Sequence, residues 1–430
     1  MTVTTSGTRT SPHDHGAWRE LLTGPGAESV LAAALGADGA RLDTWHVREL
    51  HARPGAELTV AYDVVARRRH GSTESTAHEH LFATSAAGLD PGATAPDDGV
   101  VRLDDGTHAL LVWRHPHDPA LPGLAVGTTP ARLTQRLRED GVTAEVLSLE
   151  TVTYRPLRRA VLRARTTAGT LYVKVVRPTR VAALVQRHEL FAAGDGLVAP
   201  RVLTRGEDGV VVLAELSGPS LADHLAATPA HGQPDAVDPA EIVRAAASLP
   251  PAGVGLSRRA PWADRLGRYT AALADAHGVD ADRLARLAAG VHAALRGRDL
   301  GPVVATHGDL HAANVVLSTA GADGAGPGAA PRVVGVLDVD TLGPGHLVDD
   351  LACAVAHLAV LPALAHGTYD GVEGLVERCL TVFGAEVDPV VLRARAAAVV
   401  VSLAVGAPDR AVADAWITVA ERWVAAADGF

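Results

Sequence analysis

Cysteine, methionine and lysine are all scarce in this chain. Its 430 residues include two cysteines, one methionine and a single lysine, Lys174. The cysteines, Cys353 and Cys379, form no paired spacing, which argues against a zinc site or a disulfide framework. We therefore expect the protein to work in a reducing compartment, the cytoplasm.

The chain also lacks the segments that would direct it to a membrane or to nucleic acid. No apolar run reaches the roughly 18 residues of a spanning helix, and the longest, at residues 396–407, predicts a buried helix. Residues 1–18 have no apolar h-region, so we expect no signal peptide. Arginine clusters such as Arg67–Arg69 are short and the net charge is -10, which argues against a nucleic-acid partner.

What is present is the composition of a globular protein of two or three domains. Hydrophobic residues make up 47% of the chain and charged residues 20%. Strand-like runs lie at residues 57–66, 100–113, 145–154, 160–166, 170–176, 210–216, 315–317 and 333–339. Helical spacing lies at residues 181–193, 221–227, 239–248, 262–276 and 280–296, and again from 349 to the end. The Pro-rich stretch 116–130 reads as a boundary.

One segment combines the residues that phosphoryl transfer needs. Within residues 307–314, His-Gly-Asp-Leu-His-Ala-Ala-Asn, Asp309 precedes Asn314 by five positions, and Asp338 follows in the next strand-like run. A carboxylate can orient an attacking hydroxyl and accept its proton, while amide and carboxylate oxygens hold magnesium against phosphates. We predict Asp309 as catalytic base and Asn314 and Asp338 as metal ligands. A turn or helix cap is the alternative role for Asp309.

These residues resemble the catalytic and metal-binding loops of the aminoglycoside phosphotransferase family, choline-kinase-like enzymes related to protein kinases. His307–His311 with Asn314 match the family's catalytic motif. Residues 337–340, followed by 343–345 and 350–352, resemble its metal-binding segment and the elements after it. Where the family has Gly-Asp-Pro, however, this chain has Gly-Pro-Gly at 343–345.

The upstream half carries the same resemblance. Lys174 stands where the family's third strand has the lysine that reaches the nucleotide phosphates, and Glu189 falls where its ion-pair partner belongs. Glu215 and Leu216 fall in the hinge that meets the adenine edge. A single lysine among arginines also indicates a need for a compact ammonium. The Gly-x-Gly-x-x-Gly loop of protein kinases is missing.

The resemblance implies an α+β fold, bilobal and protein-kinase-like, with a β-rich N-lobe at residues 141–216. A mostly helical C-lobe at 217–430 holds the catalytic and metal-binding loops. Residues 1–140 resemble the N-terminal α/β cap of some sugar kinases, among them the maltokinases, without a sharp motif. A weak internal similarity, Arg-Pro within both 51–54 and 153–156, indicates either a duplication or chance.

Four further residues are expected to support the site. His307 is predicted to position the loop, and Asp350 to brace it. His311 either supports the loop or contacts phosphate, and Asp340 is either a carboxylate behind the metal or a turn former. For three tryptophans, packing in a core or an interface is expected, with a place in a substrate pocket as the alternative: Trp262, Trp416 and Trp423.

Together these features predict a kinase that uses ATP or GTP with Mg²⁺ to phosphorylate a hydroxyl of a small molecule. The acceptor is either an aminoglycoside-like natural product or a sugar such as maltose or glucosamine. For an aminated acceptor, the candidate acidic residues are Asp409, Asp414 and Glu421. A non-catalytic nucleotide-binding regulator is the alternative from another class. We expect a monomer or homodimer, with no membrane and no nucleic acid as partner.

Overall fold

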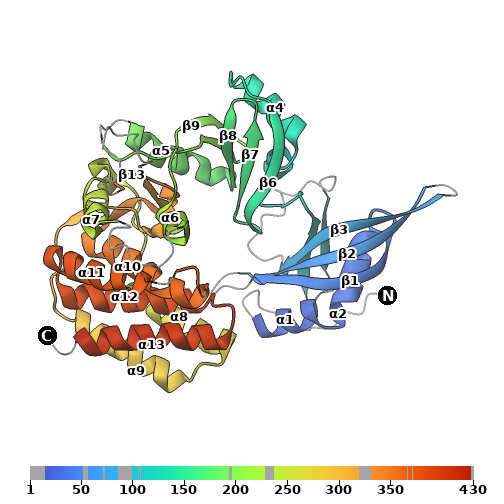
Figure 1. The fold of residues 1–430 in the computed structure, drawn as a ribbon. Coiled ribbons are helices and arrows are strands. Elements are labelled where there is room, and N and C mark those ends of the chain that lie inside the picture. Colours follow the sequence, from blue (N-terminus) through green and yellow to red (C-terminus); the bar gives the residue numbers. More distant parts are fainter. Residues whose placement is uncertain are drawn as a thin grey trace. The chain divides into compact units, whose positions relative to one another are not determined.

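The computed structural model describes residues 15–51, 57–70, 73–85, 99–104, 106, 108–192, 196–227, 237–318, 331–365, 367–369 and 371–427. They belong to two compact units (Figure 1). The first unit comprises Met1–Ala182 and Val202–Ala214, and the second comprises Ala183–Arg201 and Glu215–Phe430. Each unit is described by itself.

The first unit begins with two helices and a five-stranded antiparallel sheet of order β1-β2-β3-β5-β4. The helices are α1 (His15–Thr23) and α2 (Gly26–Gly36); the strands are β1 (Ala40–His51), β2 (Thr59–His70), β3 (Thr73–Ser85), β4 (Val100–Asp104) and β5 (Ala109–Arg114). Trp18, Leu31 and Tyr62 lie in the core between helices and sheet. The buried Tyr62 hydroxyl donates to the Leu22 carbonyl at 2.7 Å, so this polar group in the core has a hydrogen-bond partner.

A second sheet of the same unit repeats this plan, with the order β6-β7-β8-β10-β9. Its elements are α3 (Leu124–Gly127), α4 (Pro130–Glu139), β6 (Val146–Arg155), β7 (Arg159–Thr166), β8 (Gly169–Val176), η2 (Pro178–Arg180), β9 (Val202–Arg205) and β10 (Val210–Ala214). In β7, Ala160, Leu162 and Ala164 are buried and alternate with more exposed residues, the period of a strand with one face in a core. Helix α5 (Val181–Ala192) follows η2 and leads into the second unit.

The two sheets share one strand order, and two helices precede each of them. The Arg-Pro similarity falls at the end of the first strand of the second sheet, at Arg155, and just after the first strand of the first sheet. Residues 52–56 of the earlier copy lie outside the described residues. The shared topology fits a duplication, which stays an interpretation.

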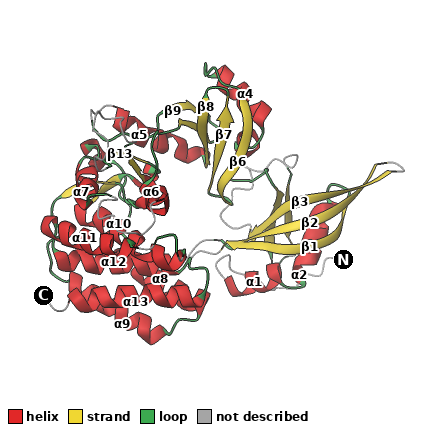
Figure 2. Cartoon of the chain, viewed as in Figure 1, coloured by secondary structure: helices red, strands yellow, loops and turns green. Residues whose placement is uncertain are grey.

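The second unit is mostly helical (Figure 2). Its helices are α6 (Leu221–Ala227), α7 (Pro239–Ala247), α8 (Leu266–His277), α9 (Ala281–Leu295), α10 (Leu347–Leu364), α11 (Val372–Glu386), α12 (Pro389–Ala404) and α13 (Arg410–Ala427). Its strands pair as β11 (Val303–Thr306) with β14 (Gly343–His346) and β12 (Val315–Leu317) with β13 (Val333–Val336). Short 3₁₀ turns are η3 (Pro251–Gly255), η4 (Ala263–Arg265), η5 (Ala312–Asn314) and η6 (Val339–Thr341).

Aspartates begin three of these helices. The side chains of Asp238, Asp280 and Asp388 accept hydrogen bonds from backbone N–H groups in the first turns of α7, α9 and α12. Helix α12 is buried on almost every side, which explains its apolar sequence and confirms the predicted buried helix around residues 396–407. Trp416 and Trp423 of α13 lie in the same core, as predicted.

One helix among the described residues, α10, is long and apolar enough to cross a membrane by length and composition, with a mean hydropathy of 1.7. Of that window, 56% is buried inside the protein. Val348, Leu351 and Val355 belong to the core of the second unit, and Asp350 in the first turn is also buried. These features are those of the core helix of a folded domain.

The structure confirms most of the predicted strands and helices and adds several strands that the sequence did not predict. These are β1, β3, β9, β11 and β14. β1 shifts register twice against β2, which breaks its alternation, and much of β3 is polar and exposed. The sequence of β14, Gly-Pro-Gly-His, is typical of a turn, and it forms a strand because it pairs with β11. The predicted strand at 333–339 ends at Val336, because the chain turns into the left-handed region at Asp338.

A glycine substitution tests the close backbone contact between Gly218 and the end of β12. At Gly218 φ is +121°, and an added Cβ would lie 2.2 Å from the Leu317 carbonyl oxygen. Gly297 also has a positive φ, +71°, but nothing lies within 4 Å of an added Cβ. We expect Gly218→Ala to lower the free energy of unfolding by roughly 2–4 kcal/mol and Gly297→Ala by about 1 kcal/mol. Urea denaturation followed by circular dichroism measures both, and equal losses would contradict the close contact.

Candidate active site

The loop that carries Asp309 leaves β11 and turns at Gly308. Gly308 has φ +76°, and an added Cβ would lie 3.1 Å from the Thr341 carbonyl oxygen, so only glycine fits without strain. The loop then enters η5 and β12. Asp309 is half-buried, and its own carbonyl accepts a hydrogen bond from the Asn314 amide nitrogen at 3.0 Å. The five-residue spacing therefore brings the predicted base and a predicted metal ligand into one loop.

Asp350 holds this loop from the first turn of α10. One carboxylate oxygen accepts from the His307 N–H at 2.7 Å and the other from the Gly308 N–H at 2.8 Å. The side chain is fully buried, and that burial raises the pKa of Asp350 to about 7 despite the two N–H donors. The arrangement is the one that the predicted bracing role requires.

His307 connects the loop to the segment after β13. Its ring is fully buried, and Nε2 donates to the Leu337 carbonyl at 2.8 Å. Burial lowers the pKa of His307, so the ring is neutral at neutral pH and is suited to positioning rather than to proton transfer. The Thr341 hydroxyl donates to the His307 carbonyl at 2.7 Å and adds a second connection between the two segments.

Asn314 and Asp338 lie at the same end of the β12–β13 hairpin. Val315 pairs with Val336, and the Leu337 N–H donates to the Asn314 carbonyl at 2.8 Å. Asp338 follows directly, in the left-handed conformation with φ 52° and ψ 51°. Since the Asn314 amide nitrogen donates to Asp309, its amide oxygen is the atom left for a cation.

The long insert of this hairpin does not disturb its base. Ser318 N–H donates to the Arg332 carbonyl at 2.8 Å, and Arg332 N–H donates to the Ser318 hydroxyl at 3.1 Å. Residues 319–330 themselves lie outside the described residues. The two predicted metal ligands are thus close in the fold although 24 positions separate them in the sequence.

Neutral side chains surround the carboxylate of Asp309. Its oxygen, the Cys353 sulfur and a His357 nitrogen lie within 4.8 Å of one another, and the His311 ring stacks on His357 at 4.4 Å. Burial lowers the pKa of His311 and His357 and raises that of Cys353. The negative charges of Asp309 and Asp338 raise the pKa of His311 and His307 and so act against the effect of burial. Negative charge is therefore concentrated here, which fits a divalent cation with oxygen ligands.

The remaining predicted residues are distributed over the two units. Asp340 is in η6, two residues after Asp338. Lys174 is in β8 of the first unit and only 6% exposed, between Val161 of β7 and Val211 of β10. Glu189 is exposed on α5 in the second unit. The predicted roles of all three stay predictions.

The predicted hinge falls where the chain passes from one unit to the other. The first unit ends at Ala214, and the second resumes at Glu215. Glu215 is exposed and Leu216 is half-buried, both just beyond the end of β10. The strand is thus two residues shorter than the predicted run, and the role of Glu215 and Leu216 in nucleotide binding stays a prediction.

Two supporting arginines were missed in the sequence. Arg187 of α5 is buried and donates to the Leu342 carbonyl at 3.0 Å, just after the metal-ligand segment. Arg395 of α12 is buried and pairs with Asp349, the neighbour of the bracing Asp350. The available signal was an arginine at a buried position of a helix, because a guanidinium inside a core requires a specific partner.

With this geometry in place, comparisons with known proteins identify the chain. The family match makes the chain a phosphotransferase that acts on an alcohol group of a small molecule. The chain belongs to the phosphotransferase enzyme family, whose model matches residues 156–377. No curated protein sequence matches it. The resemblance of the sequence motifs to this family is thereby confirmed, while the maltokinase-like cap stays a prediction.

Several solved structures are similar to this chain at low identity. Aminoglycoside phosphotransferase APH(3″)-Id from Streptomyces rimosus is 22% identical, with 62% of this chain and 97% of that chain covered and a TM-score of 0.39. Macrolide 2′-phosphotransferase MphH from Brachybacterium faecium is 17% identical, with 67% and 97% covered and a TM-score of 0.37. A microcompartment-associated aminopropanol kinase is 18% identical, with 69% and 96% covered and a TM-score of 0.45.

The titration of Asp350 yields a prediction with a definite sign. Its folded-state pKa of about 7 lies above the ordinary aspartate pKa of 3.8, so the folded protein binds more protons than the unfolded chain between these values. The stability contributed by protonated Asp350 is then lost as pH rises toward 7, by on the order of 4 kcal/mol in total. Asp350→Asn removes this titration.

We therefore expect the stability advantage of the wild type over Asp350→Asn to shrink between about pH 4 and pH 7 and to stay constant above. Urea unfolding at half-unit pH steps measures it. An advantage that grows with pH would mean that the N–H groups of His307 and Gly308 outweigh burial and keep the carboxylate ionised.

Proposed function

We propose that the protein transfers the terminal phosphate of ATP, or of GTP, to a hydroxyl group of a small molecule. The observation that supports it best is the shared location of Asp309, Asn314 and Asp338. One loop holds the first two, and the end of one hairpin holds the last two. Phosphoryl transfer needs little else from a protein than this positioning and charge.

Asp309 is the proposed base. Its half-buried carboxylate orients the acceptor hydroxyl and accepts its proton as the new oxygen–phosphorus bond forms and the bond to the nucleotide breaks. The surrounding Cys353, His311 and His357 are neutral, so no nearby thiolate or imidazolium competes for that role. The Asp350 bracing keeps the loop in place while the acceptor binds.

Asn314 and Asp338 are the proposed ligands of Mg²⁺. Amide and carboxylate oxygens are the hard donors that this ion prefers, and two such side chains leave room for water and phosphate oxygens. When bound, Mg²⁺ supplies positive charge that offsets the negative charge on the transferred phosphate. In the first unit, Lys174 is the proposed contact to the nucleotide phosphates, on the strength of its place in β8 and the family resemblance.

The intact set of residues favours an enzyme over a non-catalytic regulator. A regulator derived from this family is expected to lack a base or a metal ligand, whereas Asp309, Asn314 and Asp338 are all present. The acceptor is less constrained. Asp414 and Glu421, candidates for a site for an aminated acceptor, are engaged by Arg283 at 2.9 and 2.8 Å. This pairing reduces the case for a cationic acceptor at α13.

Asp309→Asn tests the base. The amide keeps the size and most hydrogen bonds of the side chain but cannot accept the proton, so we expect turnover to fall by about 10²–10⁴-fold. Nucleotide affinity, measured by calorimetry, should stay within about twofold because the base does not contact the nucleotide. The control is Asp275→Asn, a substitution at an exposed position of α8. Retention of full turnover by Asp309→Asn would refute the assignment.

Asp338→Asn tests the metal site. Asparagine tolerates the left-handed backbone of residue 338, so the loop should keep its conformation while one anionic ligand is lost. We expect the Mg²⁺ concentration for half-maximal nucleotide turnover to rise by about 10–100-fold. A Mg²⁺ titration of turnover measures the shift, with Asp275→Asn again as the control. An unchanged Mg²⁺ requirement would exclude Asp338 as a ligand.

A further inference from the structure

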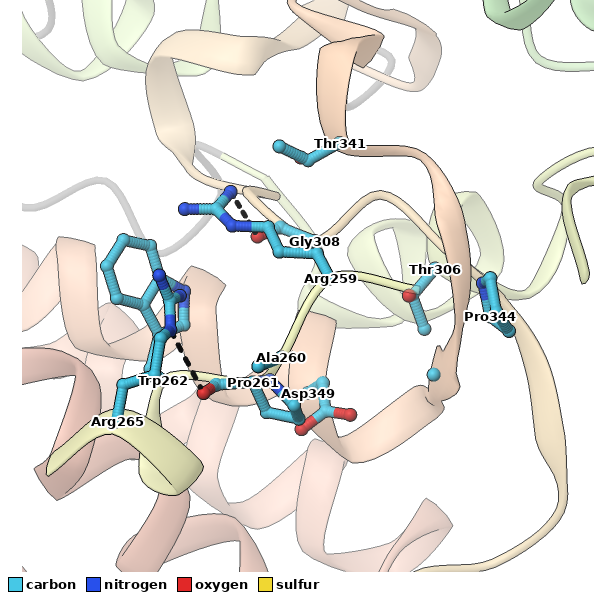
Figure 3. A pocket seen from close by; sticks show the side chains of 11 residues that line it. Arg259, Ala260, Pro261, Trp262, Arg265, Thr306, Gly308, Thr341, Pro344 and Asp349 are labelled. Carbon is cyan, nitrogen blue, oxygen red and sulfur yellow. Dashed lines mark hydrogen bonds between the residues drawn. The ribbon is translucent and has the colours of Figure 1, made fainter. Parts of the chain in front are cut away.

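A pocket beside the catalytic loop contains positive charge that the transfer chemistry does not use (Figure 3). One wall is the segment from Arg259 to Arg265, which precedes α8. The opposite wall includes Thr306, Gly308 and Thr341 of the loops described above. All of these residues belong to the second unit.

Two guanidinium groups share one aromatic ring in this pocket. The Arg259 and Arg265 guanidinium carbons lie 4.8 and 4.7 Å from the centre of the Trp262 ring. Burial, followed by the nearby charges of Arg259 and Arg268, lowers the pKa of Arg265, which marks a site with excess positive charge. Stacking on Trp262 stabilises each cation only in part, because like charges so close repel one another.

No carboxylate among the described residues forms an ion pair with either arginine, although the charge of Asp264 acts on Arg265. Asp264 pairs with Arg258 at 3.6 Å, and Asp349, which borders the pocket, is paired with Arg395. Arg259 donates only a long hydrogen bond of 3.5 Å to the Gly308 carbonyl, and Arg265 one of 3.4 Å to the Pro261 carbonyl. The pocket therefore has a net positive charge and weakly used donors.

Two buried donors on side chains that line the pocket have no acceptor among the residues that the structure describes. Trp262 Nε1 and Arg265 Nη2 are both shielded from solvent and make no hydrogen bond. An unsatisfied buried donor destabilises the folded state, and a charged one more so, which is why such groups are few in native proteins. Two N–H donors close together on an arginine and a tryptophan match the chemistry of an acceptor with several negatively charged oxygens.

We propose that this pocket binds an anionic group, a carboxylate or a phosphate monoester, that is part of the acceptor molecule. The acceptor is then a hydroxy acid, a sugar acid or a phosphorylated polyol rather than an aminated natural product. Arg259 contacts the carbonyl of Gly308, the residue before the proposed base, so an anion held here places the rest of its molecule next to Asp309. This inference rests on the proposed function and specifies its acceptor class.

The indole N–H of Trp262 provides a direct readout. The full chain, labelled with ¹⁵N-tryptophan and saturated with Mg²⁺ and a non-hydrolysable nucleotide, is titrated with acetate and with inorganic phosphate at constant ionic strength. Trp262→Phe assigns the resonance. We expect a saturable shift of the Trp262 Nε1–H signal, since that donor gains its acceptor, and the stronger of the two probes distinguishes a carboxylate from a phosphate site.

Matched variants connect that shift to the pocket. Arg265→Gln and Arg259→Gln should weaken the binding of the anion at least tenfold, whereas Arg258→Gln should not change it. Arg258 is the neighbouring arginine, but it is paired with Asp264 and does not line the pocket. The absence of a saturable shift, or an equal shift in Arg265→Gln, would overturn the proposed site.

A turnover assay tests whether the anion belongs to the acceptor. Hydroxyl compounds of matched scaffold and different charge are compared, for example glucose, glucosamine, glucuronate and glucose 6-phosphate within a wider library. We expect the best acceptors to be anionic, with KM raised at least tenfold by Arg265→Gln. A best acceptor without an anionic group would overturn the inference while Asp309-dependent turnover still supports the proposed function. If the wild-type protein turned over no nucleotide with any compound of the library, the proposed function itself would be refuted.

Discussion

The active-site loop depends on one buried carboxylate. Asp350 accepts the N–H groups of two consecutive loop residues, His307 and Gly308, and it belongs to the first turn of a core helix, α10. A carboxylate with two oxygens is well suited to hold two parallel donors. The position of Asp309, one residue further on, is thereby set by the packing of the helical core rather than by the loop itself.

His307 in turn connects this loop to the segment that carries Asp338. Nε2 of His307 donates to the Leu337 carbonyl, and the Thr341 hydroxyl donates to the His307 carbonyl, so Asp338 lies between two residues that are bonded to the same histidine. Burial keeps His307 uncharged, and it can serve this function at neutral pH without competing for protons. The proposed base and the proposed metal ligands are thus held relative to each other by contacts to the main chain.

The sequence alone predicted the elements and site residues that depend only on neighbouring positions in the chain. The five-residue spacing of Asp309 and Asn314, and the alternation in β7 and β8, are readable without tertiary structure. What it could not provide depends on distant partners. The Gly-Pro-Gly of β14 becomes a strand only by pairing with β11. Trp262 packs against the core of the second unit, as expected, and also lines a pocket whose other wall includes Gly308.

Gly308 lies between a negatively charged and a positively charged part of the site. Toward Asp309 and Asp338 the groups are carboxylates and neutral rings, an environment for a cation, while on the side of Arg259 and Arg265 the groups are guanidiniums, an environment for an anion. A side chain at residue 308 would press on Thr341 and disturb the boundary between them. Because opposite charges bound on both sides of one loop attract each other, each ligand should favour binding of the other. Such coupling would align an anionic acceptor with its hydroxyl toward the base before transfer begins.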